Sequence, residues 1–165
     1  MAGLIPDYPM RGFTLLEMLV ALVIAGIMLS MATLQLMPSA ESVLREESQR
    51  LAFLMENGAM ATQAGGKSLA WSGSGNSYRF WERNREGDWI RIERDNLLHP
   101  RVLPEGIHIT EISFDGRRLE PGALLILSPE LVARKFRVSL RSTGSLADVV
   151  GNGLGKVTVA ARGAP

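Results

Sequence analysis

One apolar run near the N-terminus constrains the fold more than any other feature of the chain. Residues 13–37 include 19 apolar residues out of 25, and Glu17 carries their only formal charge. From Met18 to Leu29 there is no polar side, so a helix here has no amphipathic stripe with which to pack on a soluble core. At about 1.5 Å per residue it would be roughly 37 Å long, enough for a bilayer core of about 30 Å. The sequence therefore predicts a transmembrane helix over 13–37.

The rest of the chain has the composition of an ordinary globular domain. The 165 residues include 18 Lys+Arg and 17 Asp+Glu, and the net charge of +1 disfavours a strongly basic nucleic-acid binder. There is no cysteine, which excludes a disulfide scaffold, a zinc ribbon and a thiol nucleophile. We therefore expect one hydrophobic helix attached to one soluble domain that folds around its own core.

The start of the apolar run differs from that of a simple membrane anchor. Arg11 and Gly12 directly precede Phe13, and Glu17 lies inside the run. A carboxylate near the middle of a bilayer costs about 2.5–3.5 kcal/mol, so such a residue usually has a partner or a function. The alternative is that Glu17 lies at the interfacial end of the helix and is solvated.

A secretory signal peptide is the main alternative for this segment. Residues 30–32, Ser-Met-Ala, resemble a small-x-small cleavage site after an apolar region. However, Glu17 interrupts that region, the apolar pattern continues past the site, and Arg11 is the only basic residue before it. A plain single-pass anchor that keeps Met1 is the third possibility.

The segment Gly12-Phe13-Thr14-Leu15-Leu16-Glu17, followed by an apolar helix, resembles the class III signal of type IV pilins and type II secretion pseudopilins. The resemblance implies that prepilin peptidase removes residues 1–12, cleaving between Gly12 and Phe13, and methylates the new amine of Phe13. It also implies that Glu17, the fifth mature residue, pairs with a terminal amine in the assembled filament. In a low dielectric such a carboxylate would neutralise the cation that cleavage creates. Glycine before the cleaved bond would let the peptidase approach the backbone closely.

Residues 38–66 have the pattern of an amphipathic helix. Pro38 predicts a kink, Ser39 can cap a restarted helix, and Gly65-Gly66 predicts its end. An apolar stripe recurs at helical spacing, which we expect to pack on the soluble domain, a surface for a partner helix being the alternative. The stripe consists of Leu44, Leu51, Leu54, Met55 and Ala59.

In residues 67–165 the apolar residues recur with the alternation that is typical of strands. Two segments, 78–83 and 89–94, flank the loop 84–88 and predict a β-hairpin, whereas residues 72–77 consist of turn formers and are expected to be a loop. Further strands are expected at 107–114, at 123–128 as a central strand, at 136–141 and at 157–161. The predicted class is α+β, a long N-terminal helix whose amphipathic half packs on a mostly antiparallel sheet or two-sheet domain.

This ordering of helix and strands is similar to that of H-type minor pseudopilins. The similarity lies in the segment from Glu41 to Leu54 that leads into the helix, in Tyr78-Arg-Phe and in residues 103–107, Leu-Pro-Glu-Gly-Ile. Related minor pilins used in DNA uptake share this type of domain. No acidic cluster resembles the calcium loop on which several major pilins depend.

No motif predicts an enzyme, a cofactor or a metal site. Residues 151–156 invite a phosphate-loop interpretation, but a P-loop needs glycine at Val150 and Ser or Thr at Val157. His99 and His108 have no neighbouring pattern of metal ligands. No serine lies in a Gly-x-Ser-x-Gly motif.

The segment 79–101 contains six arginines interleaved with aromatic residues and superficially resembles a nucleic-acid surface. Five acids nearly cancel this charge, so we interpret the pattern as cross-strand ion pairs on a solvated hairpin. The arginines are Arg79, Arg83, Arg85, Arg91, Arg94 and Arg101, and the acids are Glu82, Glu86, Asp88, Glu93 and Asp95.

Taken with its motifs, the resemblance implies a structural minor pseudopilin of a type II secretion system, which in this family lies near the tip of the pseudopilus. Residues 1–12 would be cytoplasmic, with Arg11 on the inner side, the helix would cross the inner membrane and the β-rich domain would be periplasmic. The resemblance implies other minor pseudopilins, the major pseudopilin and prepilin peptidase as partners, with no cofactor and no nucleic acid. The alternatives are a minor pilin of a type IV pilus or DNA-uptake filament that binds DNA, and an exported or anchored β-domain with a binding role.

Overall fold

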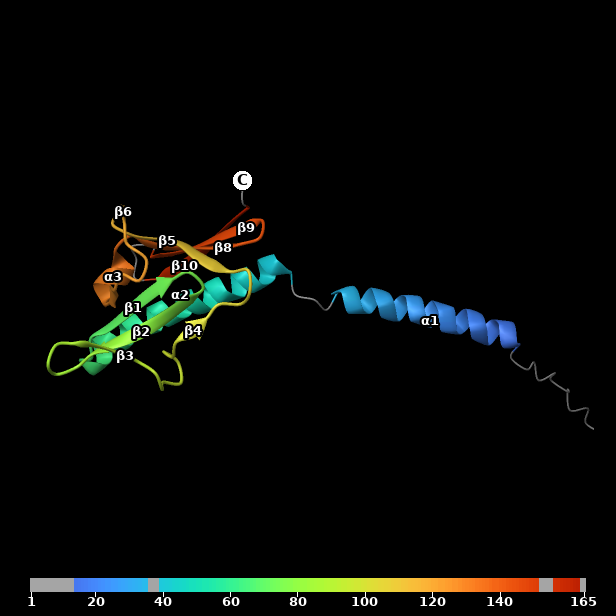
Figure 1. Cartoon of the computed structure of the whole chain (residues 1–165), viewed down its shortest axis with the longest axis horizontal. Coiled ribbons are helices and arrows are strands. Elements are labelled where there is room, and N and C mark those ends of the chain that lie inside the picture. The colour runs from blue at the N-terminus through green and yellow to red at the C-terminus, as the bar shows by residue number, and fades with distance from the viewer. Residues whose placement is uncertain (1–13, 36–38, 152–155, 164–165) are drawn as a thin grey trace, which may run out of the picture. The chain divides into compact units, whose positions relative to one another are not determined.

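The computed structural model describes residues 14–35, 39–151 and 156–163. The chain divides into two units, Met1–Pro38 and Ser39–Pro165. The first contains the helix α1 (Leu15–Gln35), and the second contains all other helices and strands (Figure 1). The predicted kink at Pro38, and the predicted cleavage residues Gly12 and Phe13, lie outside the described residues.

The second unit begins with the helix α2 (Ala40–Gly65), whose two ends are where the sequence predicts them. The Ser39 hydroxyl oxygen accepts a hydrogen bond from the Ser42 N–H at 3.1 Å, which satisfies one of the free donors of the first turn. Gly66 ends the helix in the left-handed region with φ 66°, a conformation that favours glycine. All five residues of the predicted apolar stripe are buried.

Within the described residues, ten strands form two antiparallel sheets. In the first, named sheet A, the order is β3-β2-β1-β7, with β4 also paired to β2; in the second, named sheet B, it is β10-β9-β8-β5-β6. The strands are β1 (Leu69–Ser74), β2 (Ser77–Arg83), β3 (Trp89–Arg91), β4 (Arg101–Val102), β5 (His108–Phe114), β6 (Arg117–Arg118), β7 (Leu125–Leu127), β8 (Phe136–Ser142), β9 (Ser145–Gly151) and β10 (Val157–Gly163).

The helix α2 packs on both sheets and holds them in one core. It contacts β1 and β7 of sheet A, β8, β9 and β10 of sheet B, and the short helix α3 (Pro129–Ala133). The largest fully buried side chains are aromatic: Trp71, Tyr78, Phe80 and Phe136. The rings of Tyr78 and Phe80 meet edge to face with centroids 6.0 Å apart, an arrangement that aromatic quadrupoles favour. The predicted α+β class, with an N-terminal helix on antiparallel sheets, is confirmed.

Most of the predicted strands are present with small changes in length. The hairpin of β2 and β3 has the predicted loop 84–88, and Arg83 pairs with Trp89 across it. The turn between β5 and β6 is formed by Asp115 and Gly116, both with positive φ, as the Asp-Gly pair favours. The strands β8 and β10 lie where alternation predicts them.

The prediction of a loop over 72–77 is wrong, because Ser72, Gly73 and Ser74 belong to the buried strand β1. The position of Gly73 has a steric cause: a Cβ there would lie 2.6–2.7 Å from the side chains of Ile109 and Trp71. The Ser72 hydroxyl accepts a hydrogen bond from Trp81 Nε1 at 2.8 Å. Small residues that usually form turns therefore lie in a strand here, because Gly73 leaves room for the ring of Trp71 in the same strand and for the side chain of Ile109.

Two further differences between prediction and structure concern the strands β7 and β9. The segment 123–128 was expected to be a central strand, but β7 lies at the edge of sheet A and pairs only with β1 among the described strands. Ile126 accordingly exposes 55% of its surface. The strand β9 was not predicted, because polar Ser145 and Asp148 interrupt its apolar pattern.

Candidate functional site

Glu17 lies in the first turn of α1. Its N–H donates to the Thr14 carbonyl oxygen at 3.0 Å and lies 3.2 Å from the Thr14 hydroxyl, so Thr14 caps the helix start. The Glu17 side chain is exposed, and a carboxylate at this position interacts favourably with the helix dipole. Among the described residues, none forms an ion pair with its carboxylate.

The α1 side chains from Leu15 to Ser30 are exposed on every side of the helix. Leu15 exposes 89% of its surface and Leu22 exposes 74%. A helix that is apolar all round is normally covered by lipid or by other helices. Among the described residues, no helix has both the length and the hydropathy that crossing a membrane requires. The predicted span over 13–37 begins and ends outside those residues.

The second candidate feature is an ion pair that fixes α2 to sheet A. Glu47 of α2 is buried, and Arg101 of β4 holds its carboxylate with two donors: Nε donates to Oε2 at 2.8 Å, and Nη2 donates to Oε1. A guanidinium that binds both oxygens of a carboxylate fixes orientation as well as charge. The pair therefore joins two segments 54 residues apart in the sequence.

Tyr78 lies beside this ion pair and has an unusual electrostatic environment. Burial raises the pKa of Tyr78 to about 12, and the positive charge of Arg101 opposes that shift. The hydrogen bond with Glu47 raises the pKa of the Arg101 guanidinium. The buried Tyr78 hydroxyl has no hydrogen-bond partner in the described residues. The environment therefore keeps the phenol neutral and serves packing, with no sign of acid–base chemistry.

The sequence analysis did not predict the partnership of Glu47 and Arg101. It assigned Arg101 to a solvated hairpin whose charges cancel across strands. Among the described ion pairs, however, none joins facing residues of β2 and β3. Helical phase was the signal that could have shown it, because Glu47 lies three residues after Leu44 and four before Leu51 on the apolar stripe.

The described residues show no arrangement typical of a catalytic or metal site. No group of three or more His, Asp or Glu side chains in the described ranges is placed to hold a metal ion. His99 and His108 are both exposed, as alternation predicts for His108. Residues 152–155, the centre of the loop considered for phosphate binding, lie outside the described ranges.

Comparison with known proteins adds three findings. The prokaryotic N-terminal methylation motif matches residues 9–33, which include Gly12, Phe13 and Glu17. No curated protein matches the chain in sequence.

The solved structures that match include two of the minor pseudopilin EpsH from the type II secretion system of Vibrio cholerae. One match has 17% identity and a TM-score of 0.54, and covers 76% of this chain and 96% of EpsH. The other has 16% identity and the same TM-score, with 76% and 98% coverage. The chain therefore carries a prepilin-type methylation motif and has a fold similar to that of a minor pseudopilin.

Proposed function

We propose that this chain is a non-enzymatic minor pseudopilin of the H type, which assembles near the tip of a type II secretion pseudopilus and supports protein export. The observation that carries the proposal is the combination within one chain of the methylation motif at residues 9–33 and the pseudopilin fold. Neither is sufficient alone, because the motif is common to prepilin-type proteins and the likeness to EpsH is at 17% identity.

The two units have separate tasks in this proposal. Before assembly α1 anchors the protein in the inner membrane, with residues 1–12 in the cytoplasm and the β-rich domain in the periplasm. After cleavage between Gly12 and Phe13, α1 leaves the lipid and packs among like helices of the filament. The exposed apolar side chains on every side of α1 support this, because each neighbour can cover a different side.

Glu17 would direct that packing. Its carboxylate is exposed and has no partner among the described residues, while cleavage creates a cation at Phe13 of each subunit. In the low dielectric of a filament core, an unpaired carboxylate is costly and a paired one fixes axial position. The expected neighbours are other minor pseudopilins and the major pseudopilin.

Replacement of Gly12 tests the processing step. We expect Gly12→Trp to accumulate as an uncleaved precursor, because its side chain obstructs the peptidase at the cleaved bond. Gly3→Trp, a matched change within the leader, is expected to be trimmed like the wild type. Immunoblots that show normal trimming of Gly12→Trp would refute the proposed cleavage.

Replacement of Glu17 tests the assembly step separately. Glu17→Ala is expected to be trimmed normally but to enter filaments poorly and to reduce secretion. Glu41→Ala is the matched control, because Glu41 is an exposed acid in the first turn of α2. Undiminished secretion by Glu17→Ala, measured against that control, would count against the pairing.

A DNA-uptake minor pilin would share the same methylation motif, so DNA binding is the property that separates the two assignments. That assignment predicts salt-sensitive binding of duplex DNA. The secretion assignment predicts no shift of duplex DNA by the purified full-length protein in a mobility assay at low salt.

A further inference from the structure

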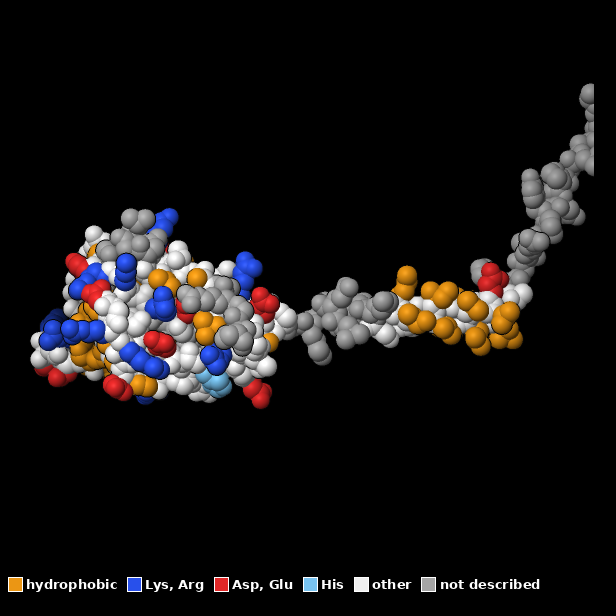
Figure 2. All heavy atoms as spheres, turned by 90° about the horizontal axis from the view of Figure 1, so that it is seen from above, with side chains coloured by type: hydrophobic (Ala, Val, Ile, Leu, Met, Phe, Trp, Pro, Cys, Tyr) orange, Lys and Arg blue, Asp and Glu red, His pale blue; other side chains and the backbone are white. Residues whose placement is uncertain are grey.

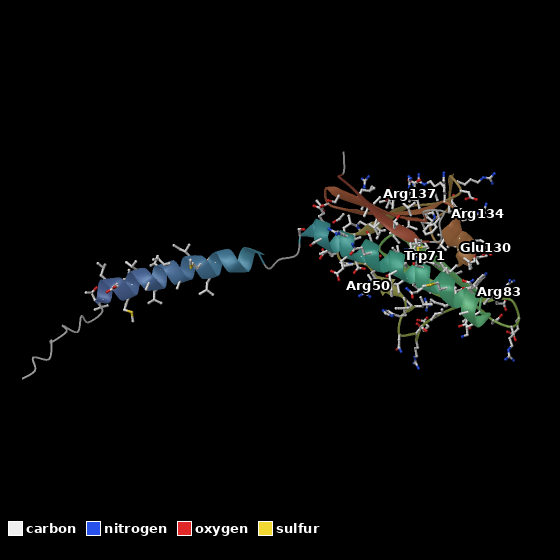
Figure 3. The ribbon with its side chains drawn as sticks, turned by 180° about the vertical axis from the view of Figure 1, so that it is seen from behind. Arg50, Trp71, Arg83, Glu130, Arg134 and Arg137 are labelled. Carbon is white, nitrogen blue, oxygen red and sulfur yellow. The ribbon has the colours of Figure 1, made fainter. Side chains whose placement is uncertain are left out.

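The side of sheet B that faces away from α2 carries a concentration of positive charge. Alternation along β8 directs Phe136, Val138 and Leu140 into the core and leaves Arg137 and Arg141 exposed on the opposite side. Figure 3 shows Arg137 on the side of the sheet away from α2. We name this outer surface the basic face; its cations are Arg118, Lys135, Arg137 and Arg141, with exposed His108 at one end.

The strand register places Arg118, Arg137 and Arg141, together with His108, in two rows across the sheet. In the first row Ser113 pairs with both Arg118 of β6 and Arg137 of β8. In the second row His108 pairs with Arg141. Since Arg137 and Arg141 are four residues apart on one strand, the two rows are separated by about 13 Å.

An acidic row lies between the two cationic rows. Glu111 of β5 pairs with Ser139 of β8, which pairs with Asp148 of β9. Asp148 is only 2% exposed; it accepts a hydrogen bond from the Ser139 hydroxyl at 2.7 Å and lies 3.7 Å from Arg137 Nε. Glu111 is exposed. The face therefore presents a positive, negative and positive pattern along the strand direction.

The first cationic row borders an open hollow of about 590 Å³. Arg118, Lys135 and Arg137 surround it, and Ser113 and Val150 lie in its lining. Of the described residues that line it, Glu111 is the only acidic one. Figure 2, which views the domain from the side of sheet B, shows separate groups of basic side chains with acidic ones between them. The surface can thus receive a side chain of opposite charge as well as attract it.

We infer that the basic face docks an acidic, extended protein segment whose carboxylates lie about 13 Å apart with a cation between them. The two carboxylates would meet the rows of Arg137 and Arg141, and the cation would meet Glu111. In an extended chain, residues four positions apart have this spacing and lie on the same side. The assignment of this segment to a neighbouring filament subunit rests on the proposed function. The docking chemistry itself is independent of the proposed function.

Charge complementarity favours a protein segment over nucleic acid. A phosphate backbone is uniformly negative, and the acidic row with Glu111 would repel it where it crosses the sheet. Among the described residues of the basic face, no Phe, Trp or Tyr side chain is exposed on which a base could stack. Alternating charges, in contrast, reject partners whose charges are out of register.

The test uses the purified full-length protein in detergent and a labelled peptide, Thr-Glu-Thr-Lys-Thr-Glu-Thr. A peptide with both Glu replaced by Gln is the control ligand. We expect the acidic peptide to bind and the Gln peptide to bind more weakly, by up to about thirtyfold, because each of the two exposed ion pairs contributes up to about 1 kcal/mol. Raising the salt concentration should weaken binding of the acidic peptide only.

Charge reversal locates the binding surface. The double variant Arg118→Glu/Arg141→Glu changes two exposed cations of the basic face, and Arg85→Glu/Arg94→Glu changes two exposed arginines near sheet A. We expect the first pair to abolish measurable peptide binding and the second to leave it unchanged. Circular dichroism of both variants checks that the fold is retained.

Three results would overturn the inference: equal binding of both peptides, equal losses in the two double variants, or tighter binding of duplex DNA or of phosphatidylglycerol vesicles by the basic face. A wild-type chain that is trimmed and enters filaments but does not bind the acidic peptide refutes the docking inference and leaves the proposed function intact. A chain that binds the peptide but keeps its leader refutes the proposed function alone.

Discussion

The helices α1 and α2 differ in where their partners are. In α1 the apolar side chains from Leu15 to Leu29 are exposed on all sides, whereas α2 buries one stripe against the sheets of the same chain and exposes mostly polar residues elsewhere. The chain therefore encodes a complete partner for α2. The α1 helix belongs to the other unit of the chain, and within the described residues of that unit no surface covers its apolar side chains.

The two helices also differ in how they use an acidic residue in an apolar setting. Glu47 of α2 is buried and held by Arg101, whereas Glu17 of α1 is exposed. We interpret the first as a means of fixing a fold and the second as a means of fixing an assembly. The predictions for Arg101 and for Glu17 test whether this division holds, and those for Gly73 and Tyr78 test the packing of the domain.

The largest effect is expected from breaking the pair of Glu47 and Arg101. Arg101→Met leaves a buried carboxylate unpaired and should lower the free energy of unfolding by about 3 kcal/mol. The double variant Glu47→Leu/Arg101→Met should recover most of this, because leucine continues the stripe of Leu44 and Leu51. Urea unfolding of the full-length protein measures both. A single variant as stable as the wild type would show that the ion pair does not hold α2 in place.

A smaller loss is expected from Gly73→Ala. The added methyl would lie about 2.6–2.7 Å from Ile109 and Trp71 side-chain atoms, and overpacking of this kind costs about 1–3 kcal/mol. Gly65→Ala is the control, because nothing lies within 4 Å of a Cβ there. Comparable unfolding midpoints for the two variants would contradict the tight packing of Gly73 against the side chains of Ile109 and Trp71.

Tyr78 should produce a loss of stability at alkaline pH. Its pKa is about 12 in the folded protein and about 10 in an unfolded chain, so between these values the unfolded state binds fewer protons. Stability is full below pH 10 and then falls by up to about 1.4 kcal/mol per pH unit until pH 12. Tyr78→Phe should remove this component of the slope and leave stability at neutral pH unchanged or higher, because the hydroxyl has no partner among the described residues. Urea titrations between pH 8 and pH 11 test this, and identical slopes would contradict it.

The smallest effect on folding is expected from Glu17→Gln. Its side chain is exposed and has no described partner, so the free energy of unfolding of the domain should change by less than about 0.5 kcal/mol. The same variant should nevertheless reduce entry into filaments. A substantial loss of domain stability would show that Glu17, like Glu47, contributes to folding, and would contradict a role in assembly alone.

Local signals in the sequence predicted the ends of α2 and its buried stripe, because each depends on residues close together in the chain. Ser39 and Gly66 are a capping residue and a left-handed residue, and the stripe from Leu44 to Ala59 repeats at the helical period. The edge position of β7 could not be predicted, because an apolar run does not reveal which strands will lie beside it. β1 was missed because Ser72 and Gly73 favour turns, and the need for a small residue at Gly73 depends in part on Ile109, which only the folded chain brings next to it.

For the candidate site, too, local sequence signals predict a residue's position but not its distant partners. Helical phase alone places Glu47 on the buried side of α2, but its partner Arg101 is 54 residues away and only the folded sheet brings the two together. The basic face could not be predicted either, since its rows come from β5, β6 and β8, whose register is set by the whole sheet. Gly12, Phe13 and Glu17 were predicted from a contiguous motif, and their roles remain predictions.

Mass spectrometry of the N-terminus of the protein, isolated from cells that express a prepilin peptidase, tests the central claim most directly. A helix made for assembly should begin at a newly formed amine, so the account predicts an N-methylated phenylalanine at Phe13. A mature protein that begins at Met1, as for a plain anchor, or at Thr33, as for an exported protein, would contradict it.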